Sequence, residues 1–117
     1  MDATQAALDE KLANLLKQAA KVASQIQAEK QGPGTPHYDE IEIPAHDVGQ
    51  QLGRMIQSAR NVDVATGQAA DIDCPECGKS CRVKINLREI HSMDGPVELT
   101  ENVAHCRRCR RSFFPSA

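Results

Sequence analysis

The chain has 117 residues and a formal net charge of −2, which allows one ordinary domain or two small modules. It contains no Trp, one Tyr and two Phe, so a large aromatic core is excluded and stability must come from helix packing, a partner or a metal ion. The N-terminus has no signal-peptide core and no run reaches membrane-spanning length, so we expect a cytoplasmic protein without membrane association.

Residues 1–31 predict one long amphipathic helix, rich in Ala, Leu, Gln, Glu and Lys, with Asp2 or Thr4 as its N-cap. Its apolar residues follow the alternating four-three spacing of a coiled-coil seam. This stripe could pack on a second helix of the same chain or on a second copy of the chain, and both alternatives stay open. A homodimer would use the stripe residues Leu8, Leu12, Leu15, Val22 and Ile26, with Ala19 between them.

A Gly/Pro-rich linker at residues 32–36 separates this helix from a second helical segment at residues 37–61. Proline is tolerated in the first turn of a helix but kinks or breaks a helix interior, so the second helix either begins at Pro44 or is kinked there. We expect it to run from about Pro44 to Arg60. Residues 62–73 mix small residues with Asp and Gly and predict a flexible connector.

Residues 74–115 carry the most specific pattern of the chain, two Cys-x-x-Cys pairs that flank alternating apolar and polar residues. The alternation predicts a strand after the first pair and a strand returning to the second pair, joined by a turn. A three-residue loop at residues 94–96 would place the odd-numbered apolar residues of both strands on one face. The expected fold class is therefore α+β, a helical hairpin followed by a small zinc ribbon.

The two cysteine pairs predict a structural zinc site. Zinc prefers four soft ligands in a tetrahedron, and a two-residue spacer lets one tight turn direct two sulfur atoms at the same ion. An odd total of five cysteines also argues against a disulfide framework. Iron is a chemical alternative, although the second pair lacks the glycine that follows the first. The predicted ligands of one zinc ion are Cys74, Cys77, Cys106 and Cys109.

Two other residues are rival ligands. Cys81 follows Cys77 by only four positions, and we expect it in the first strand as a free or buried thiol that faces away from the ion. His105 is adjacent to Cys106, and neighbouring strand residues point to opposite faces, so we expect it beside the ligands or exposed. The remaining histidines lie away from the cysteine pairs and are not expected to bind the ion: His37, His46 and His91.

A site with four thiolate ligands is closed, whereas a catalytic zinc ion keeps one position open for water or substrate. The sequence places no Glu or His beside the site as a general base. A thiol-redox role would need a βαβ context, which the pattern does not predict. We therefore predict no catalytic residues, no enzymatic activity and no small-molecule substrate.

Four arginines surround the second cysteine pair, and Phe113 and Phe114 follow directly. Guanidinium groups bind phosphate oxygens bidentately, and exposed aromatic rings stack on bases. Alternatively, the arginines offset the negative charge of a four-thiolate site and the two Phe side chains pack against the hairpin. The predicted nucleic-acid contacts are Arg107, Arg108, Arg110, Arg111, Lys79, Arg82 and Lys84.

Three segments carry a resemblance to a known family: Cys74–Gly78, Gly95–Leu99 and His105–Pro115. They resemble the zinc-ribbon region near the N-terminus of ISKra-type insertion-sequence transposases, and a looser resemblance extends back to residue 37. The resemblance implies that the four paired cysteines bind metal and that the ribbon contacts DNA or assists assembly. Those transposases continue into an RNase H-like domain with catalytic acidic residues, and no position of this chain matches them.

Two functions follow as hypotheses. The first is a non-catalytic zinc-ribbon protein that binds DNA, as a transposase-like fragment or an accessory factor in transposition. The second is a zinc-stabilised protein–protein interaction module that dimerises through its N-terminal helix.

Overall fold

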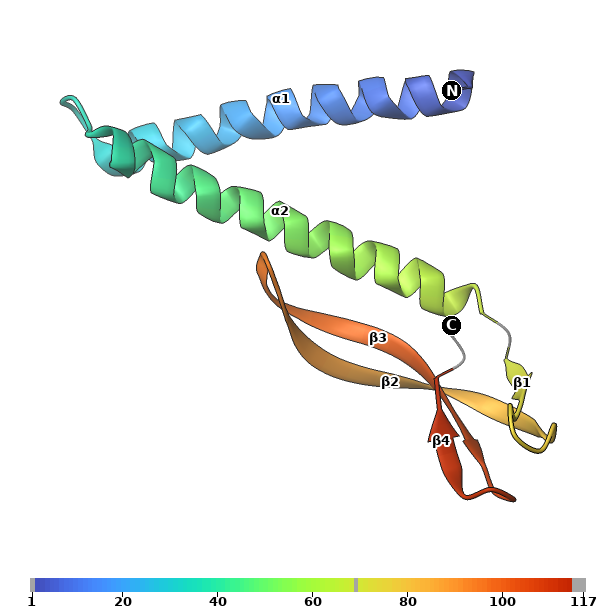
Figure 1. The fold of residues 1–117 in the computed structure, drawn as a ribbon. Helices are drawn as coiled ribbons and strands as arrows, with labels where there is room; N and C mark the ends of the chain where they lie inside the picture. Colours follow the sequence, from blue (N-terminus) through green and yellow to red (C-terminus); the bar gives the residue numbers. More distant parts are fainter. Residues whose placement is uncertain (1, 69, 115–117) are drawn as a thin grey trace. The chain divides into compact units, whose positions relative to one another are not determined.

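A computed structural model of the chain describes residues 2–68 and 70–114, and it shows two helices followed by a four-stranded antiparallel sheet (Figure 1). This arrangement confirms the predicted α+β class. The chain divides after Gly49 into two compact units, which are described separately below. The elements are α1 (Ala3–Gln31), α2 (Tyr38–Thr66), β1 (Asp71–Asp73), β2 (Ser80–Ser92), β3 (Gly95–Cys106) and β4 (Arg111–Phe113).

Helix α1 has a defined cap at each end. The Asp2 side chain accepts a hydrogen bond from the backbone N–H of Gln5 at 2.8 Å, which satisfies one of the free donors of the first turn. At the other end, Gly32 has a φ of 69° and donates its N–H to the carbonyl of Ala28. Glycine adopts this left-handed conformation without steric cost, so the helix ends where the predicted linker begins.

Helix α2 begins at Tyr38, earlier than the predicted start near Pro44, and Pro44 lies inside it. Proline has no N–H to donate to the carbonyl four residues earlier, which belongs to Glu40. That carbonyl instead accepts a hydrogen bond from the Gln31 side chain at 2.9 Å. The Glu40 side chain also accepts from the backbone N–H of His37, which caps the new start of the helix. The predicted start near Pro44 was wrong, because Gln31 satisfies the carbonyl that the proline leaves free and the Glu40 side chain caps the helix at its earlier start.

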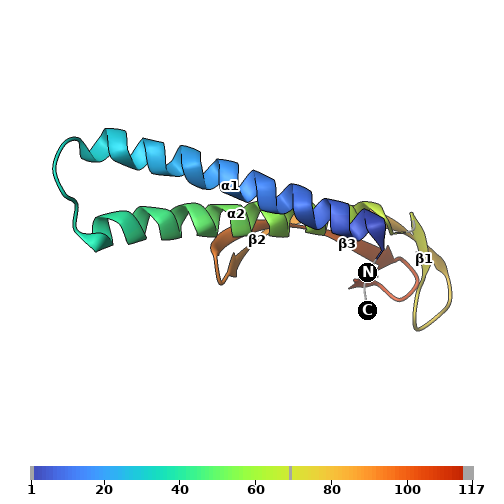
Figure 2. The ribbon, with the colours of Figure 1, turned by 90° about the horizontal axis from the view of Figure 1, so that it is seen from above.

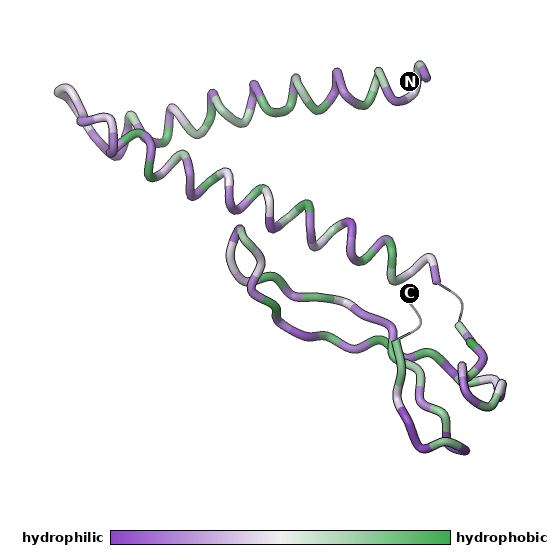
Figure 3. The backbone as a smooth tube through the Cα atoms, in the orientation of Figure 1, coloured by the Kyte–Doolittle hydropathy of each residue, from purple (hydrophilic) through white to green (hydrophobic). Residues whose placement is uncertain are grey.

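The apolar stripe of α1 is largely open to solvent. No residue of α1 is buried, and the apolar positions recur along the helix in the hydropathy colouring (Figure 3). Leu8, Leu15 and Ile26 are each about half exposed, at 56%, 50% and 48%. Neither helix, over the residues that the structure describes, is long and apolar enough to cross a membrane.

In the second unit, the C-terminal half of α2 lies along the hairpin formed by β2 and β3 (Figures 1 and 2). Asp94, at the hairpin tip, accepts hydrogen bonds from Arg54 through its carbonyl at 2.8 Å and from Gln57 through its carboxylate at 2.9 Å. A Cβ at Gly53 would lie 2.7 Å from the Asp94 carboxylate, so a larger residue at this position would require the Asp94 side chain to shift. The helix and the hairpin are therefore held together by specific polar contacts.

At the other end of the contact between α2 and the hairpin lies the buried side-chain amide of Asn102. Asn102 on β3 is 8% exposed, and its side chain donates to the backbone carbonyl of Ala65 at 2.9 Å and to the side chain of Gln68. Carbonyls in the last turn of a helix have no partner within the helix, so Asn102 caps the C-terminus of α2 from the sheet. Between the two ends, the Asn61 side chain accepts from the backbone N–H of Thr100.

The predicted connector at residues 62–73 has a different structure. Its first part continues α2 to Thr66, whose hydroxyl donates to the carbonyl of Val62 at 3.0 Å. Its last part forms β1, which pairs with β2 so that Asp71 lies opposite Arg82 and Asp73 opposite Ser80. Short polar segments of this kind have little strand propensity of their own, and pairing with β2 determines the strand.

The hairpin register also differs from the prediction. Ser92 pairs with Gly95, so the turn contains two residues, Met93 and Asp94, rather than three. Gly95 takes a φ of 111°, which a residue with a side chain rarely adopts. The shorter turn pairs odd residues of β2 with even residues of β3, for example Ile85 with Asn102. The expected common apolar face therefore does not form, and Ile85 is 63% exposed.

Candidate metal centre

The first knuckle, residues 74–79, is a tight turn between β1 and β2. The N–H of Cys74 donates to the carbonyl of Lys79 at 2.8 Å, and the N–H of Gly78 donates to the carbonyl of Cys74 at 2.9 Å. Gly78 has a φ of 74°, a conformation that glycine adopts without steric cost. These bonds bring the side chains of Cys74 and Cys77 to one side of the turn.

The second knuckle, residues 106–110, connects β3 to β4 in the same way. The backbone N–H of Cys109 donates to the Cys106 sulfur atom at 3.4 Å. Arg110 stands one residue after the last cysteine, as Gly78 does in the first knuckle, and it also has a positive φ, 56°. Among the described residues other than glycine, Arg110 alone has a positive φ. The turn thus forms without glycine, at the steric cost of a left-handed arginine.

The two knuckles bring the four predicted ligands together. The Sγ atoms of Cys74, Cys77, Cys106 and Cys109 all lie within 4.8 Å of one another. The distance from Cys74 Sγ to Cys109 Sγ is 3.8 Å, and that from Cys77 Sγ to Cys106 Sγ is 3.5 Å. A tetrahedron with metal–sulfur bonds of about 2.3 Å has edges of about 3.8 Å. The four sulfur atoms therefore fit one tetrahedral metal ion.

Two of these cysteines, Cys74 and Cys106, belong to the buried core of the ribbon, which we define as residues 71–114. Cys106 and Ala104 are fully buried, and Cys74 and Cys81 are each 5% exposed. Partly buried apolar side chains, including Phe113, pack around this cluster. So small an apolar core cannot offset the entropy of ordering the chain, and a bound metal ion would supply the missing stability.

Hydrogen bonds shift the pKa values of Cys106 and Cys109 in opposite directions. The N–H of Cys109, followed by smaller contributions from other donors, lowers the pKa of Cys106 to about 6 in spite of burial. The hydrogen bond between Cys77 and Cys109, together with burial, raises the pKa of Cys109 to about 12. One thiolate therefore forms readily in the metal-free cluster, and its charge opposes ionisation of a neighbour. A divalent cation relieves this repulsion and displaces the remaining protons.

The rival ligands lie outside the four-cysteine cluster. The Cys81 thiol donates to the backbone carbonyl of Lys79 at 3.3 Å, and burial raises its pKa, so it stays protonated. His105 is exposed, and its ring nitrogen Nδ1 hydrogen-bonds with the hydroxyl of Ser112 at 3.1 Å. The exposure of His105 and the burial of Cys81 agree with the predictions, but Cys81 packs in the same buried core as Cys74 and Cys106 rather than away from them. No histidine belongs to the cluster within the described part of the chain.

All seven predicted nucleic-acid contacts have exposed side chains. Arg111 forms an ion pair with Glu76 of the first knuckle, which the sequence pattern did not indicate. The other six take part in neither of the two ion pairs found among the described residues. Phe113 is partly buried against the metal cluster, whereas Phe114 is 59% exposed. The two adjacent rings therefore have different surroundings.

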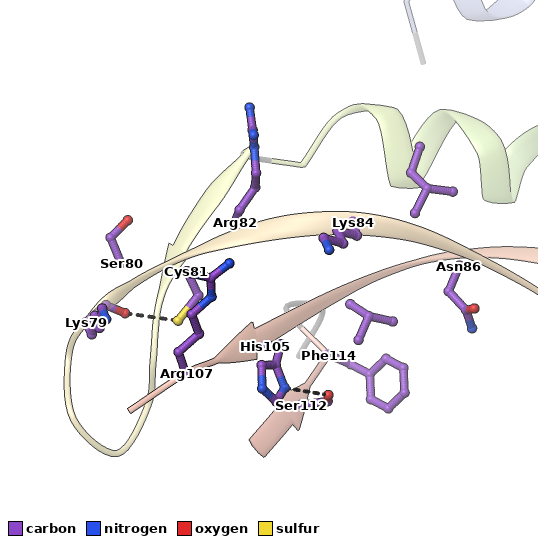
Figure 4. A pocket seen from close by; sticks show the side chains of 12 residues that line it. Lys79, Ser80, Cys81, Arg82, Lys84, Asn86, His105, Arg107, Ser112 and Phe114 are labelled. Atoms are coloured by element: carbon purple, nitrogen blue, oxygen red, sulfur yellow. Dashed lines mark hydrogen bonds between the residues drawn. The ribbon is translucent and has the colours of Figure 1, made fainter. Parts of the chain in front are cut away.

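One hollow on the ribbon was not predicted. It has a volume of about 800 Å³ and includes side chains from β2, β3, β4 and the second knuckle (Figure 4). Four of the predicted cationic contacts line it: Lys79, Arg82, Lys84 and Arg107. The sequence indicated each of these four residues as a nucleic-acid contact. Which of them line one hollow depends on the strand register, which was not predicted.

The geometry defines a four-cysteine cluster that is able to hold a metal ion, built by two knuckles on an antiparallel sheet. Comparison with protein-family models, with curated proteins and with solved structures gives no match.

Proposed function

We propose that this chain is a non-catalytic zinc-ribbon protein that binds DNA, similar in role to the ribbon region of ISKra-type transposases. Zinc is the metal proposed because four thiolates in a tetrahedron are its typical structural donor set. Such a site has no open position, so the ion would hold the two knuckles together and leave the surface of the ribbon to make contacts.

One observation carries the DNA-binding proposal: the ribbon exposes six predicted contact residues whose positive charges are not neutralised by ion pairs among the described residues. Phosphate contacts from Lys and Arg supply most of the affinity of sequence-independent DNA binding. Residues 71–117 have only one more basic than acidic side chain, so the local arrangement rather than the net charge must provide the affinity.

A mobility-shift titration of the zinc-loaded chain with duplex DNA tests this proposal. If about four phosphates are contacted, raising the salt from 50 to 200 mM should weaken binding about a hundredfold. Replacing four arginines with alanine should weaken low-salt binding at least tenfold: Arg107, Arg108, Arg110 and Arg111. The matched control removes four lysines of α1 and should change the affinity less than threefold: Lys11, Lys17, Lys21 and Lys30. Absence of low-salt binding to both the duplex and its separated strands, or equal losses in both variants, would contradict the proposal.

A second candidate function is an interaction module that dimerises through α1. The observation that favours it is the exposed stripe, because Leu12 and Val22 are 52% and 54% exposed and no residue of α1 is buried. Exposed apolar stripes at coiled-coil spacing associate in water to remove this surface.

Size-exclusion chromatography with light scattering tests the dimer. We expect twice the 12.8 kDa mass of the chain at micromolar concentration. Leu15→Glu should give the monomer mass, because it places a charge within the apolar seam. Ala20→Glu, which adds the same charge on another side of α1, should remain dimeric. A monomer at high concentration would remove this candidate and leave DNA binding to be judged separately.

A further inference from the structure

The hollow on the ribbon combines positive charge with an exposed aromatic ring. Its lining includes four cationic side chains and no carboxylate. Figure 4 shows Lys84, Arg107, His105 and Phe114 around this concavity, while the Arg82 side chain extends from its edge. Cations gathered without a counter-charge favour an anionic ligand.

The two acidic side chains that form ion pairs on the ribbon pair with arginines that do not line the hollow, although Glu101 also accepts a hydrogen bond from the lining residue Asn86 at 3.1 Å. Glu101 pairs with Arg88 at 3.2 Å, and Glu76 pairs with Arg111. Neither of these glutamates lines the hollow. Lys84 and Arg107 therefore keep hydrogen-bond donors available for an external anion such as a phosphate group.

Recognition of a nucleotide needs a surface for its base as well as cations for its phosphate, and Phe114 offers such a surface. Its ring is 59% exposed at the hollow, although the adjacent Phe113 is partly buried with the cysteine cluster. A ring exposed beside cationic side chains offers a face on which an unpaired base can stack while its phosphate contacts the cations. The hollow is of the size that accommodates small ligands, about 300–1,000 Å³, which suits one or two nucleotides.

We propose that this hollow binds an unpaired DNA strand, with Lys84 and Arg107 contacting the phosphates and a base stacking on Phe114. This inference rests on the proposed DNA-binding function and specifies the form of DNA. In a duplex the bases already stack on their neighbours and pair, so no base is free to cover Phe114. Contacts with a duplex would be confined to its phosphates. A single strand would make phosphate contacts and also stack a base on Phe114, so it should bind more tightly.

Fluorescence anisotropy with the zinc-loaded full chain tests the inference, using a labelled thymidine 12-mer and a duplex of equal length. We expect the single strand to bind at least tenfold more tightly than the duplex. Phe114→Ala should weaken single-strand binding about tenfold and duplex binding less than twofold, because one stacked base contributes about 1–3 kcal/mol. Leu87→Ala removes another apolar side chain, 58% exposed on β2, and should change neither affinity.

Lys84→Ala provides a second variant that leaves the aromatic ring and the metal cluster intact. It should reduce the slope of log affinity against log salt by about 0.7 for the single strand. Zinc content measured by native mass spectrometry should stay at one ion in each variant. Unchanged single-strand affinity in both Phe114→Ala and Lys84→Ala, or tighter binding to the duplex, would overturn the inference. If the duplex still bound, the proposed DNA-binding function would stand without the single-strand inference. Failure to bind either DNA at low salt would refute the proposed function and the inference together.

Discussion

Replacing Cys106 with serine is expected to abolish zinc binding and to unfold the ribbon. Cys106 is fully buried, and its sulfur atom lies 3.5 Å from that of Cys77 within the cluster. A hydroxyl is a much poorer zinc ligand than a thiolate. Structural zinc contributes on the order of 10 kcal/mol in small domains, comparable with the whole stability of a typical domain. Native mass spectrometry should show no bound zinc, and the amide resonances of the ribbon should lose their dispersion.

The matched control is Cys81→Ser, which removes another buried thiol from the same ribbon. A serine hydroxyl at this position can still donate to the carbonyl of Lys79, as the thiol does. One zinc ion per chain and a dispersed spectrum are expected. If Cys81→Ser lost the ion while Cys106→Ser kept it, the assignment of the four ligands would be wrong.

Asn102→Ala should destabilise the zinc-loaded protein by about 2 kcal/mol. The Asn102 amide is buried, and its loss leaves the carbonyl of Ala65 and the side chain of Gln68 without this donor. Small cavities add to the cost of an unsatisfied polar group. Urea unfolding monitored by helical circular dichroism should show a lower midpoint with little change in the m-value.

Asn86→Ala is the control for this substitution, because Asn86 is an exposed asparagine on β2 that donates to Glu101 at 3.1 Å. An exposed hydrogen bond of this kind contributes little, so a change within about 0.5 kcal/mol is expected. Equal effects of the two substitutions would show that the contact between β3 and α2 does not stabilise the second unit.

The metal cluster could be predicted from the sequence because each Cys-x-x-Cys pair is a local feature. A two-residue spacer determines the turn, and the two strands that follow bring the pairs together regardless of small errors in register. The helical segments were predictable for the same reason, since their spacing and the N-cap at Asp2 are local. These features depend on few residues at short separation.

The remaining features depend on contacts between distant residues. Pro44 is accommodated in α2 because Gln31 reaches the carbonyl of Glu40, and no local rule indicates that contact. The predicted loop at residues 94–96 would place Ile85 opposite His105, whereas Ile85 pairs with Asn102 because the turn contains only two residues. The register therefore differs by three residues, an odd number, and this moved the apolar side chains of the two strands onto opposite faces. The hollow depends on that register, so it could be found only in three dimensions.

One metal ion is proposed to hold the two knuckles of the ribbon together. The most direct test compares amide spectra of the zinc-loaded chain before and after exhaustive chelation. The resonances of residues 71–114 should collapse to the narrow range of an unfolded chain, and the helical signal of α1 should persist. A ribbon that stays dispersed without any metal ion would contradict the central claim.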